Sequence, residues 1–264
     1  MYLYLLDVSH NAISTGYLAS FCETLLENLD KIPGDSRTQI GFITYNNSLH
    51  FYNLSDSLSQ PRMMIYPDLE DVELPMPDSL LVNLNENKES IKLFLESLPN
   101  LFADTYETDS ALGTALNSAF LLLKQTGGHI TIMQSCLPNV GIGALKKRDE
   151  NIDKDSSNLA PQTDFYKKLA LDCAGAQICV DLFMFNSLYA DLATLSCVSK
   201  YSGGEIKYYP GFHTEHFPEQ VIRFSVDFKR YITRKIGFES VMRIRCTRGN
   251  NNLILRFKRK QVRL

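Results

Sequence analysis

Short, almost wholly apolar segments recur along the first 210 or so residues and alternate with segments whose apolar residues have helical spacing. The first, residues 2–8, is interrupted only by Asp7 near its end, which is typical of a strand buried on both faces of a parallel sheet. The turn-forming pair Asn46-Asn47 predicts a hairpin, and residues 63–66 fit an edge strand. Besides 2–8, strands are expected at 38–45, 48–54, 63–66, 129–136, 179–185 and 205–209.

Helices are predicted wherever apolar residues recur every three or four positions. They are expected from Ser14 to Leu29, at 86–98 just before Pro99, at 111–125, 163–174 and 191–200, and from Pro218 to about Lys235. The last helix has these residues available for burial: Val221, Ile222, Phe224, Phe228 and Ile232. Alternating strands and helices predict an α/β fold, a mostly parallel sheet covered by helices on both faces. The predicted core contains Leu3, Leu5, Ile40, Phe42, Ile130, Ile132, Val180, Leu182 and Phe183.

Two segments do not fit this alternation. Residues 146–162 carry charge, Ser and Asn but few apolar side chains, so a protruding, solvated loop is predicted. In residues 241–247, apolar and polar positions alternate, which predicts a half-solvated antiparallel strand. A second, all-β element is therefore expected to begin there.

The composition is that of a folded soluble protein, with 264 residues, 44% hydrophobic and 22% charged. No apolar run approaches the ~18 residues of a membrane span. The first residues lack the basic region and cleavage site of a secretory signal, so a cytosolic protein is expected. The formal net charge of −3 predicts no binding to nucleic acid. Residues 229–264 differ from the rest, with 12 basic residues and one acidic residue.

The cysteines show no metal-binding spacing. They form no Cys-x-x-Cys pair and have no histidine nearby at ligand spacing, so a structural zinc site is not expected. Reduced and mostly buried thiols are the prediction for all six, which are Cys22, Cys136, Cys173, Cys179, Cys197 and Cys246.

The segment Asp7-Val8-Ser9-His10-Asn11 follows the first predicted strand. It approximates Asp-x-Ser-x-Ser, the first half of the metal-ion-dependent adhesion site of von Willebrand A domains, which binds Mg²⁺ through oxygen ligands. Residues 108–110 fit the Thr-containing loop of that site, but the strand 129–136 ends in Gln-Ser-Cys, where a carboxylate is needed. We therefore expect no metal, and interpret Asp7, Ser9 and Asn11 as a degenerate remnant in which Asp7 and Ser9 bond backbone groups.

A hydrolase would require a nucleophile beside a base. The candidate nucleophile and bases are Ser9, His10, His50, His129, His213 and His216. No Gly-x-Ser-x-Gly segment occurs, and the neighbours Ser9 and His10 would point to opposite sides of an extended chain. Gly127-Gly128 precedes a strand instead of opening a helix, which argues against a phosphate cradle. Neither an enzyme nor a cofactor is predicted.

Collinear segments along most of the chain resemble one protein family. The matching segments are 5–12, 25–30, 33–37, 40–42, 51–54, 77–84, 110–113, 163–170, 199–202 and 229–239. Taken together, these segments resemble the trunk domain of the Sec24 family, the cargo-selecting subunit of the COPII inner coat. The Ser9-His10-Asn11 version of the first motif is most similar to the A and B paralogues.

The resemblance implies a von Willebrand A-like fold used for protein contact, with a degenerate metal site. It implies a trunk domain over 1–237, the first part of a β-sandwich over 238–249, and a divergent basic tail over 250–264. The implied function is pairing with the partner trunk subunit of the inner coat in endoplasmic reticulum to Golgi transport, in the cytoplasm at exit sites and on COPII vesicles. Cargo or SNARE proteins would be bound by the full-length family member.

The sequence leaves open both the function and the origin of the chain. A metal-dependent ligand-binding von Willebrand A domain is the second functional hypothesis. Most of the β-sandwich and the zinc-finger, helical and gelsolin-like parts of the family have no counterpart here, so a fragment, a splice form and a gene-model artefact are all compatible with the sequence.

The final 17 residues of the chain, which include the tail, carry six basic residues and no acid, interleaved with apolar ones. Such a cationic, amphipathic end is suited to peripheral contact with an anionic membrane, where each basic residue contributes about 1 kcal/mol. A terminus without a selected role and a nuclear import signal are the alternatives.

If the tail binds membranes, the chain will sediment with phosphatidylserine vesicles at low salt. It should be released near or above physiological ionic strength, because salt screens the attraction. Truncation after Gly249 should remove the binding. Sedimentation that survives this truncation would place the membrane contact elsewhere in the chain.

Overall fold

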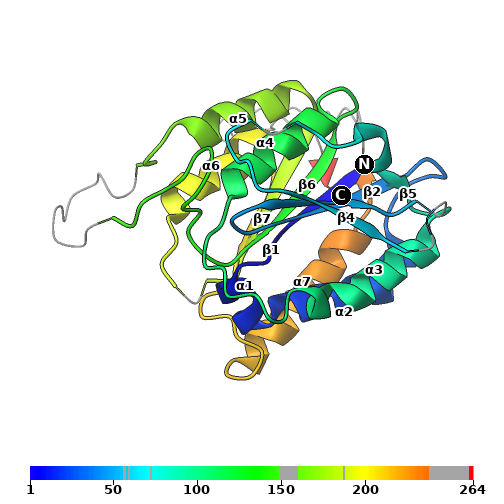
Figure 1. Ribbon diagram of the computed structural model, residues 1–264, viewed down its shortest axis with the longest axis horizontal. Helices are drawn as coiled ribbons and strands as arrows, with labels where there is room; N and C mark the ends of the chain where they lie inside the picture. The colour runs from blue at the N-terminus through cyan, green and yellow to red at the C-terminus, as the bar shows by residue number, and fades with distance from the viewer. Residues whose placement is uncertain are drawn as a thin grey trace, which may run out of the picture.

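The computed structural model describes residues 1–55, 58, 60–71, 73–148, 160–186, 188–237 and 262–263. Through the centre of this part of the chain runs an eight-stranded sheet, in the order β4-β3-β2-β1-β6-β7-β8 with β5 beside β2 (Figure 1). Pairing is parallel from β2 through β1, β6 and β7 to β8, and antiparallel for β3, β4 and β5. The strands are β1 (Tyr2–Asp7), β2 (Gln39–Tyr45), β3 (Leu49–Asn53), β4 (Arg62–Tyr66), β5 (Val82–Asn83), β6 (Gly128–Gln134), β7 (Ile178–Met184) and β8 (Ile206–Tyr208).

Helices cover both faces of the sheet, as Figure 1 shows. One face is covered by α2 (Tyr17–Asn28), α3 (Lys88–Leu101) and α7 (Pro218–Thr233). The other is covered by α4 (Leu112–Leu123), α5 (Phe165–Gly175) and α6 (Leu192–Ser202). The short α1 (His10–Thr15) follows β1, and β9 (Ile236–Gly237) pairs with β10 (Val262–Arg263) apart from the main sheet. The predicted α/β fold, with its hairpin and edge strand, is confirmed.

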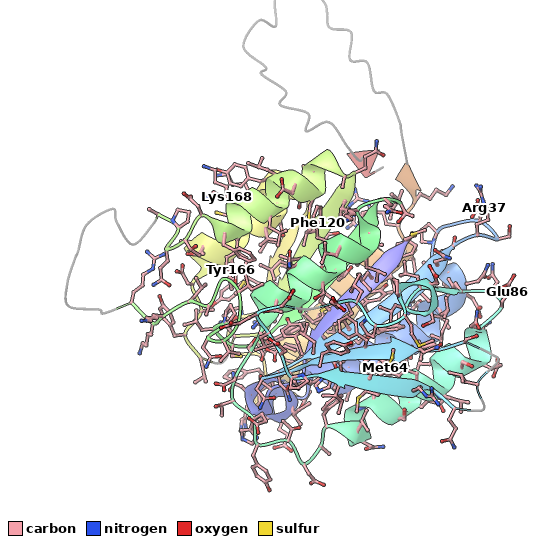
Figure 2. The ribbon with its side chains drawn as sticks, turned by 45° about the horizontal axis from the view of Figure 1, so that its top comes forward. Arg37, Met64, Glu86, Phe120, Tyr166 and Lys168 are labelled. Carbon is pink, nitrogen blue, oxygen red and sulfur yellow. The ribbon has the colours of Figure 1, made fainter. Side chains whose placement is uncertain are left out.

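Alternation along β1 divides the core into two layers. Tyr4 faces α2, α3 and α7, where its ring stacks on Phe42 at a centroid distance of 5.4 Å. Leu5 points to the opposite layer, toward α4, α5 and α6. Figure 2 shows side chains filling this second layer, with Phe120 labelled on α4 and Tyr166 on α5. All nine predicted core residues are at most 2% exposed, which confirms that prediction.

The largest differences from the predicted helix boundaries are in the first helical segment and in α3. The first helical segment begins at His10, and Gly16, with φ of 74°, separates α1 from α2. A side chain at Gly16 would also collide with Thr214, so a glycine is required there. Helix α3 continues past Pro99 to Leu101, because Leu98 and Phe102 on either side of the proline are buried and hold this turn on the core.

The prediction for α7 was wrong at Ile222, which is 65% exposed. Two residues correspond to about 200° around a helix, so Ile222 lies opposite the buried Phe224. Phe228 and Ile232 are buried as expected, because they share the side of Phe224. Val226, at 62% exposure, lies on the outward side with Ile222.

Several predictions fall on residues that the structure does not describe. These include residues 149–159 of the expected loop, the strand at 241–247, Cys246, and all of the tail except 262–263. At the described ends of the loop, the amide of Lys146 donates to Gln162 Oε1 at 2.9 Å. Among the described residues, no helix combines the length and apolar character needed to cross a membrane.

Replacing Leu5 by Asp is expected to abolish folding. Leu5 is fully buried in the central strand, and the change removes its packing and places an unpaired carboxylate there. The combined cost is comparable to the ~5–15 kcal/mol that stabilises a typical domain. Ile65→Asp, at a 56% exposed position of the edge strand β4, is the matched control and should fold. Circular dichroism melting measures both; an unchanged melting temperature for Leu5→Asp would refute the assigned position of β1.

Candidate functional site

The fully buried carboxylate of Asp7 lies at the carboxyl end of β1. Its Oδ1 accepts a hydrogen bond from the Ser9 amide at 3.0 Å. Its Oδ2 accepts from the Ser135 amide at 3.0 Å and from the Ser135 hydroxyl at 2.7 Å. Ser135 is in reach because β1 and β6 pair in parallel and end side by side. The carboxylate therefore joins the ends of two central strands.

Ser9 and Asn11 hold the beginning of α1 against the same point. Ser9 is the N-cap of α1, and its Oγ accepts from the Ala12 amide at 3.4 Å. The Asn11 side-chain amide donates to the Ser135 carbonyl at 3.3 Å. Asp7, Ser9 and Asn11 thus come together, and the bonds include the backbone contacts expected of a strand-end turn.

The loop at 108–110 also reaches this end of the sheet. Ser110 Oγ accepts from Gln134 Nε2 at 2.9 Å, and Asp109 Oδ1 accepts from the Asn139 side-chain amide at 2.6 Å. Gln134 also accepts from the Tyr45 hydroxyl at 2.6 Å. Gln134 therefore lies in a hydrogen-bonded network near Asp7, in the segment that would supply the second carboxylate of an adhesion site.

Two further buried groups complete the surroundings of Asp7. The Tyr17 hydroxyl donates to the Asp7 main-chain carbonyl. The Cys136 thiol lies 3.5 Å from Asp7 Oδ2. Burial and then the neighbouring Asp7 charge raise the pKa of both Tyr17 and Cys136, so both stay protonated and act as donors. Sequence reasoning missed Ser135 and Cys136 as donors, because their approach depends on the register of β1 against β6.

This donor set does not fit a divalent cation. Mg²⁺ requires oxygen ligands with free lone pairs and usually more than one carboxylate or phosphate. Here the two oxygens of Asp7 face two amides, a hydroxyl and a thiol. A cation would have to displace these donors. What the arrangement provides is a fixed junction of β1, β6 and α1.

Ser9 is not paired with a base. Its hydroxyl contacts the Cys136 sulfur at 3.5 Å, whereas the His10 ring bonds the Thr105 carbonyl at 3.0 Å and stacks on Tyr106. His213 and His216 lie against each other, with ring centroids 4.3 Å apart, in the segment before α7. The serines and histidines considered for hydrolysis therefore do not assemble around Ser9.

A hydrogen bond of 3.2 Å joins Ser48 Oγ to His50 Nε2. The other ring nitrogen of His50 faces the Thr44 hydroxyl at 3.0 Å, not a carboxylate. Burial lowers the pKa of His50 to about 4. A base with so low a pKa is poorly matched to a serine near neutral pH.

Fold and site together define a von Willebrand A-like domain whose strand-end carboxylate is bonded internally. The family profile described as the Sec23/Sec24 trunk domain matches residues 1–232. The chain belongs to this family.

Individual relatives agree with this assignment. The chain is 58% identical to human protein transport protein Sec24B and 55% identical to human Sec24A, over 94% of its length in each case. It spans only 20% and 23% of those two proteins. The crystal structure of the human COPII-coat protein Sec24c is similar with a TM-score of 0.83 and 37% identity, covering 90% of this chain and 32% of that one.

The lowered pKa of His50 predicts a loss of stability in mild acid. The unfolded chain takes up a proton near pH 6.5 and the folded chain only near pH 4, so stability falls as the pH drops through this window. Between pH 7 and pH 5 the loss from this residue is about 2 kcal/mol. Urea unfolding of the parent and of His50→Gln, which does not titrate there, measures it; equal pH dependence in the two proteins would contradict the assignment.

Proposed function

We propose that this chain is the trunk part of a COPII coat cargo adaptor, a protein-interaction module in endoplasmic reticulum to Golgi transport. Its membership of the Sec23/Sec24 trunk family over residues 1–232 is the observation that carries the proposal. The high identity to human Sec24A and Sec24B supports the cargo-adaptor branch of that family. The proposed place of action is the cytoplasmic side of endoplasmic reticulum exit sites and COPII vesicles.

The surroundings of Asp7 favour a contact function that needs neither catalysis nor a cation. In a metal-dependent adhesion domain the ligand completes the shell of a bound ion, so its oxygen ligands have to be open. Here the Asp7 carboxylate is fully buried and bonded to Ser9 and Ser135. Binding through the protein surface is therefore proposed, ahead of the metal-dependent alternative.

The proposed partner is the Sec23 trunk. One family profile describes the trunk domains of both Sec23 and Sec24, so the partner would have the same fold. Identical subunits commonly associate about a two-fold axis through equivalent surfaces, and the proposed pairing extends this arrangement to two subunits of the same fold. Cargo and SNARE recognition is proposed for the full-length protein, since this chain spans only about a fifth of its relatives.

Purified Sec23 should be captured by the immobilised chain at micromolar concentration. A specific interface of at least about 1,000 Å² is expected to support that affinity. The matched control is the chain truncated after Gly249, which lacks the basic tail and should capture Sec23 equally well. Capture lost with the tail would indicate charge attraction alone, and a folded chain that captures nothing would count against the proposed pairing.

A further inference from the structure

A polar cluster interrupts the aromatic layer beneath α7. It consists of His129 on β6 and of Cys179 and Asp181 on β7, which are 1%, 5% and 0% exposed. His129 and Cys179 are direct partners in the parallel pairing of these strands. Asp181 lies two residues further along β7 and so faces the same side of the sheet. The register therefore brings together three side chains from positions about 50 residues apart in sequence.

The ligand atoms of these side chains are close enough to share one ion. A ring nitrogen of His129, the Cys179 sulfur and a carboxylate oxygen of Asp181 all lie within 4.8 Å of one another. His129 Nδ1 and Asp181 Oδ2 are 3.5 Å apart. In tetrahedral zinc sites, bonds of about 2.0–2.3 Å place the ligand atoms about 3.3–3.8 Å from one another. Small side-chain adjustments suffice to reach that geometry.

Neighbouring groups already fix two of the three side chains. Asp181 accepts hydrogen bonds from the Glu205 amide and from the Tyr231 hydroxyl, both at 2.7 Å. The ring of Tyr2 stacks on His129 with an interplanar angle of 16°. Hydrogen bonds to a ligating carboxylate and restraint of a ligating imidazole are typical of the surroundings of protein metal sites.

A polar cavity of about 240 Å³ lies next to the cluster. Its lining comprises Glu205, Lys207, Asp227, Arg230, Tyr231 and Arg234. Two of these lining residues, Glu205 and Tyr231, are the ones that donate hydrogen bonds to Asp181.

We propose that His129, Cys179 and Asp181 form a buried binding site for one Zn²⁺ ion. The combination of imidazole, thiolate and carboxylate favours Zn²⁺ over Mg²⁺ and Ca²⁺, which prefer oxygen alone. On binding, the Cys179 thiol releases its proton to solvent and the sulfur bonds to the metal. Asp7 is at the carboxyl end of β1, whereas His129 lies near the amino end of β6. The proposed zinc site is therefore separate from the fixed junction of β1, β6 and α1.

Cobalt titration of the full chain tests the proposal, because Co²⁺ occupies zinc sites and reports its ligands by absorption. One equivalent should produce a thiolate-to-cobalt charge-transfer band and the strong visible bands of tetrahedral Co²⁺, and Zn²⁺ should displace both. The bands should vanish in Cys179→Ser and His129→Gln. They should persist in Cys173→Ser, a buried thiol on α5, and in Asp7→Asn.

Zinc should also stabilise the chain. At a free concentration a hundred times the Kd, the melting temperature should rise by about 5 °C or more in the parent and in Cys173→Ser, but not in Cys179→Ser. If a variant fails to fold, the absorption spectrum of the parent chain with Co²⁺ still tests the proposed site. Absence of the thiolate band there, or bands that survive Cys179→Ser, would overturn the proposed site; neither result bears on Sec23 binding.

Discussion

The buried carboxylate of Asp7 is the interaction on which the ends of the central strands depend. It accepts from the backbone that enters α1 and from Ser135 at the end of β6, and so connects three segments that meet at one end of the sheet. Burying a charge is costly unless donors replace the lost water. The two amides and the hydroxyl supply that compensation, and the Cys136 thiol adds a weaker contact.

In this von Willebrand A-like fold, internal hydrogen bonds of the Asp7 carboxylate join the ends of the central strands. The fold brings an acidic strand end, a Ser at the start of a helix and a polar loop to one place. In this chain Gln134, the last residue of β6, and the adjacent Ser135 provide donors in place of a second carboxylate. The same end of the sheet is thereby held together by internal hydrogen bonds.

Much of the fold follows from local sequence patterns. Leu5 and Ile132 are core because each lies within a short apolar run, and the edge position of β4 follows from its mixed composition. Pro99 and Ile222 were mispredicted for different reasons. Tertiary packing carried α3 past Pro99, although a proline usually ends a helix. Ile222 is exposed because its exact angular position on α7 turns it away from the core. The closeness of Asp7, Ser9 and Asn11 followed from their spacing.

Contacts between distant strands were not predictable in the same way. Ser135 reaches Asp7, and Cys179 reaches His129, only because of the register of parallel strands separated by long connections. Absence of a Cys-x-x-Cys pair excludes local zinc motifs but says nothing about ligands assembled by strand pairing. The positions of strands can be predicted from a single sequence. Which residues become neighbours across paired strands is much harder to predict from it.

The stability of Asp7→Ala relative to the parent, measured by urea unfolding with and without millimolar Mg²⁺, tests the central claim most directly. If Asp7 is an internal junction, the variant loses about 3 kcal/mol, because buried donors of Ser9 and Ser135 are left unpaired. That loss should be the same in both conditions, and Mg²⁺ should not change the stability of the parent. A parent protein stabilised by Mg²⁺, beside an Asp7→Ala variant that Mg²⁺ leaves unaffected, would contradict the account and identify Asp7 as a metal ligand.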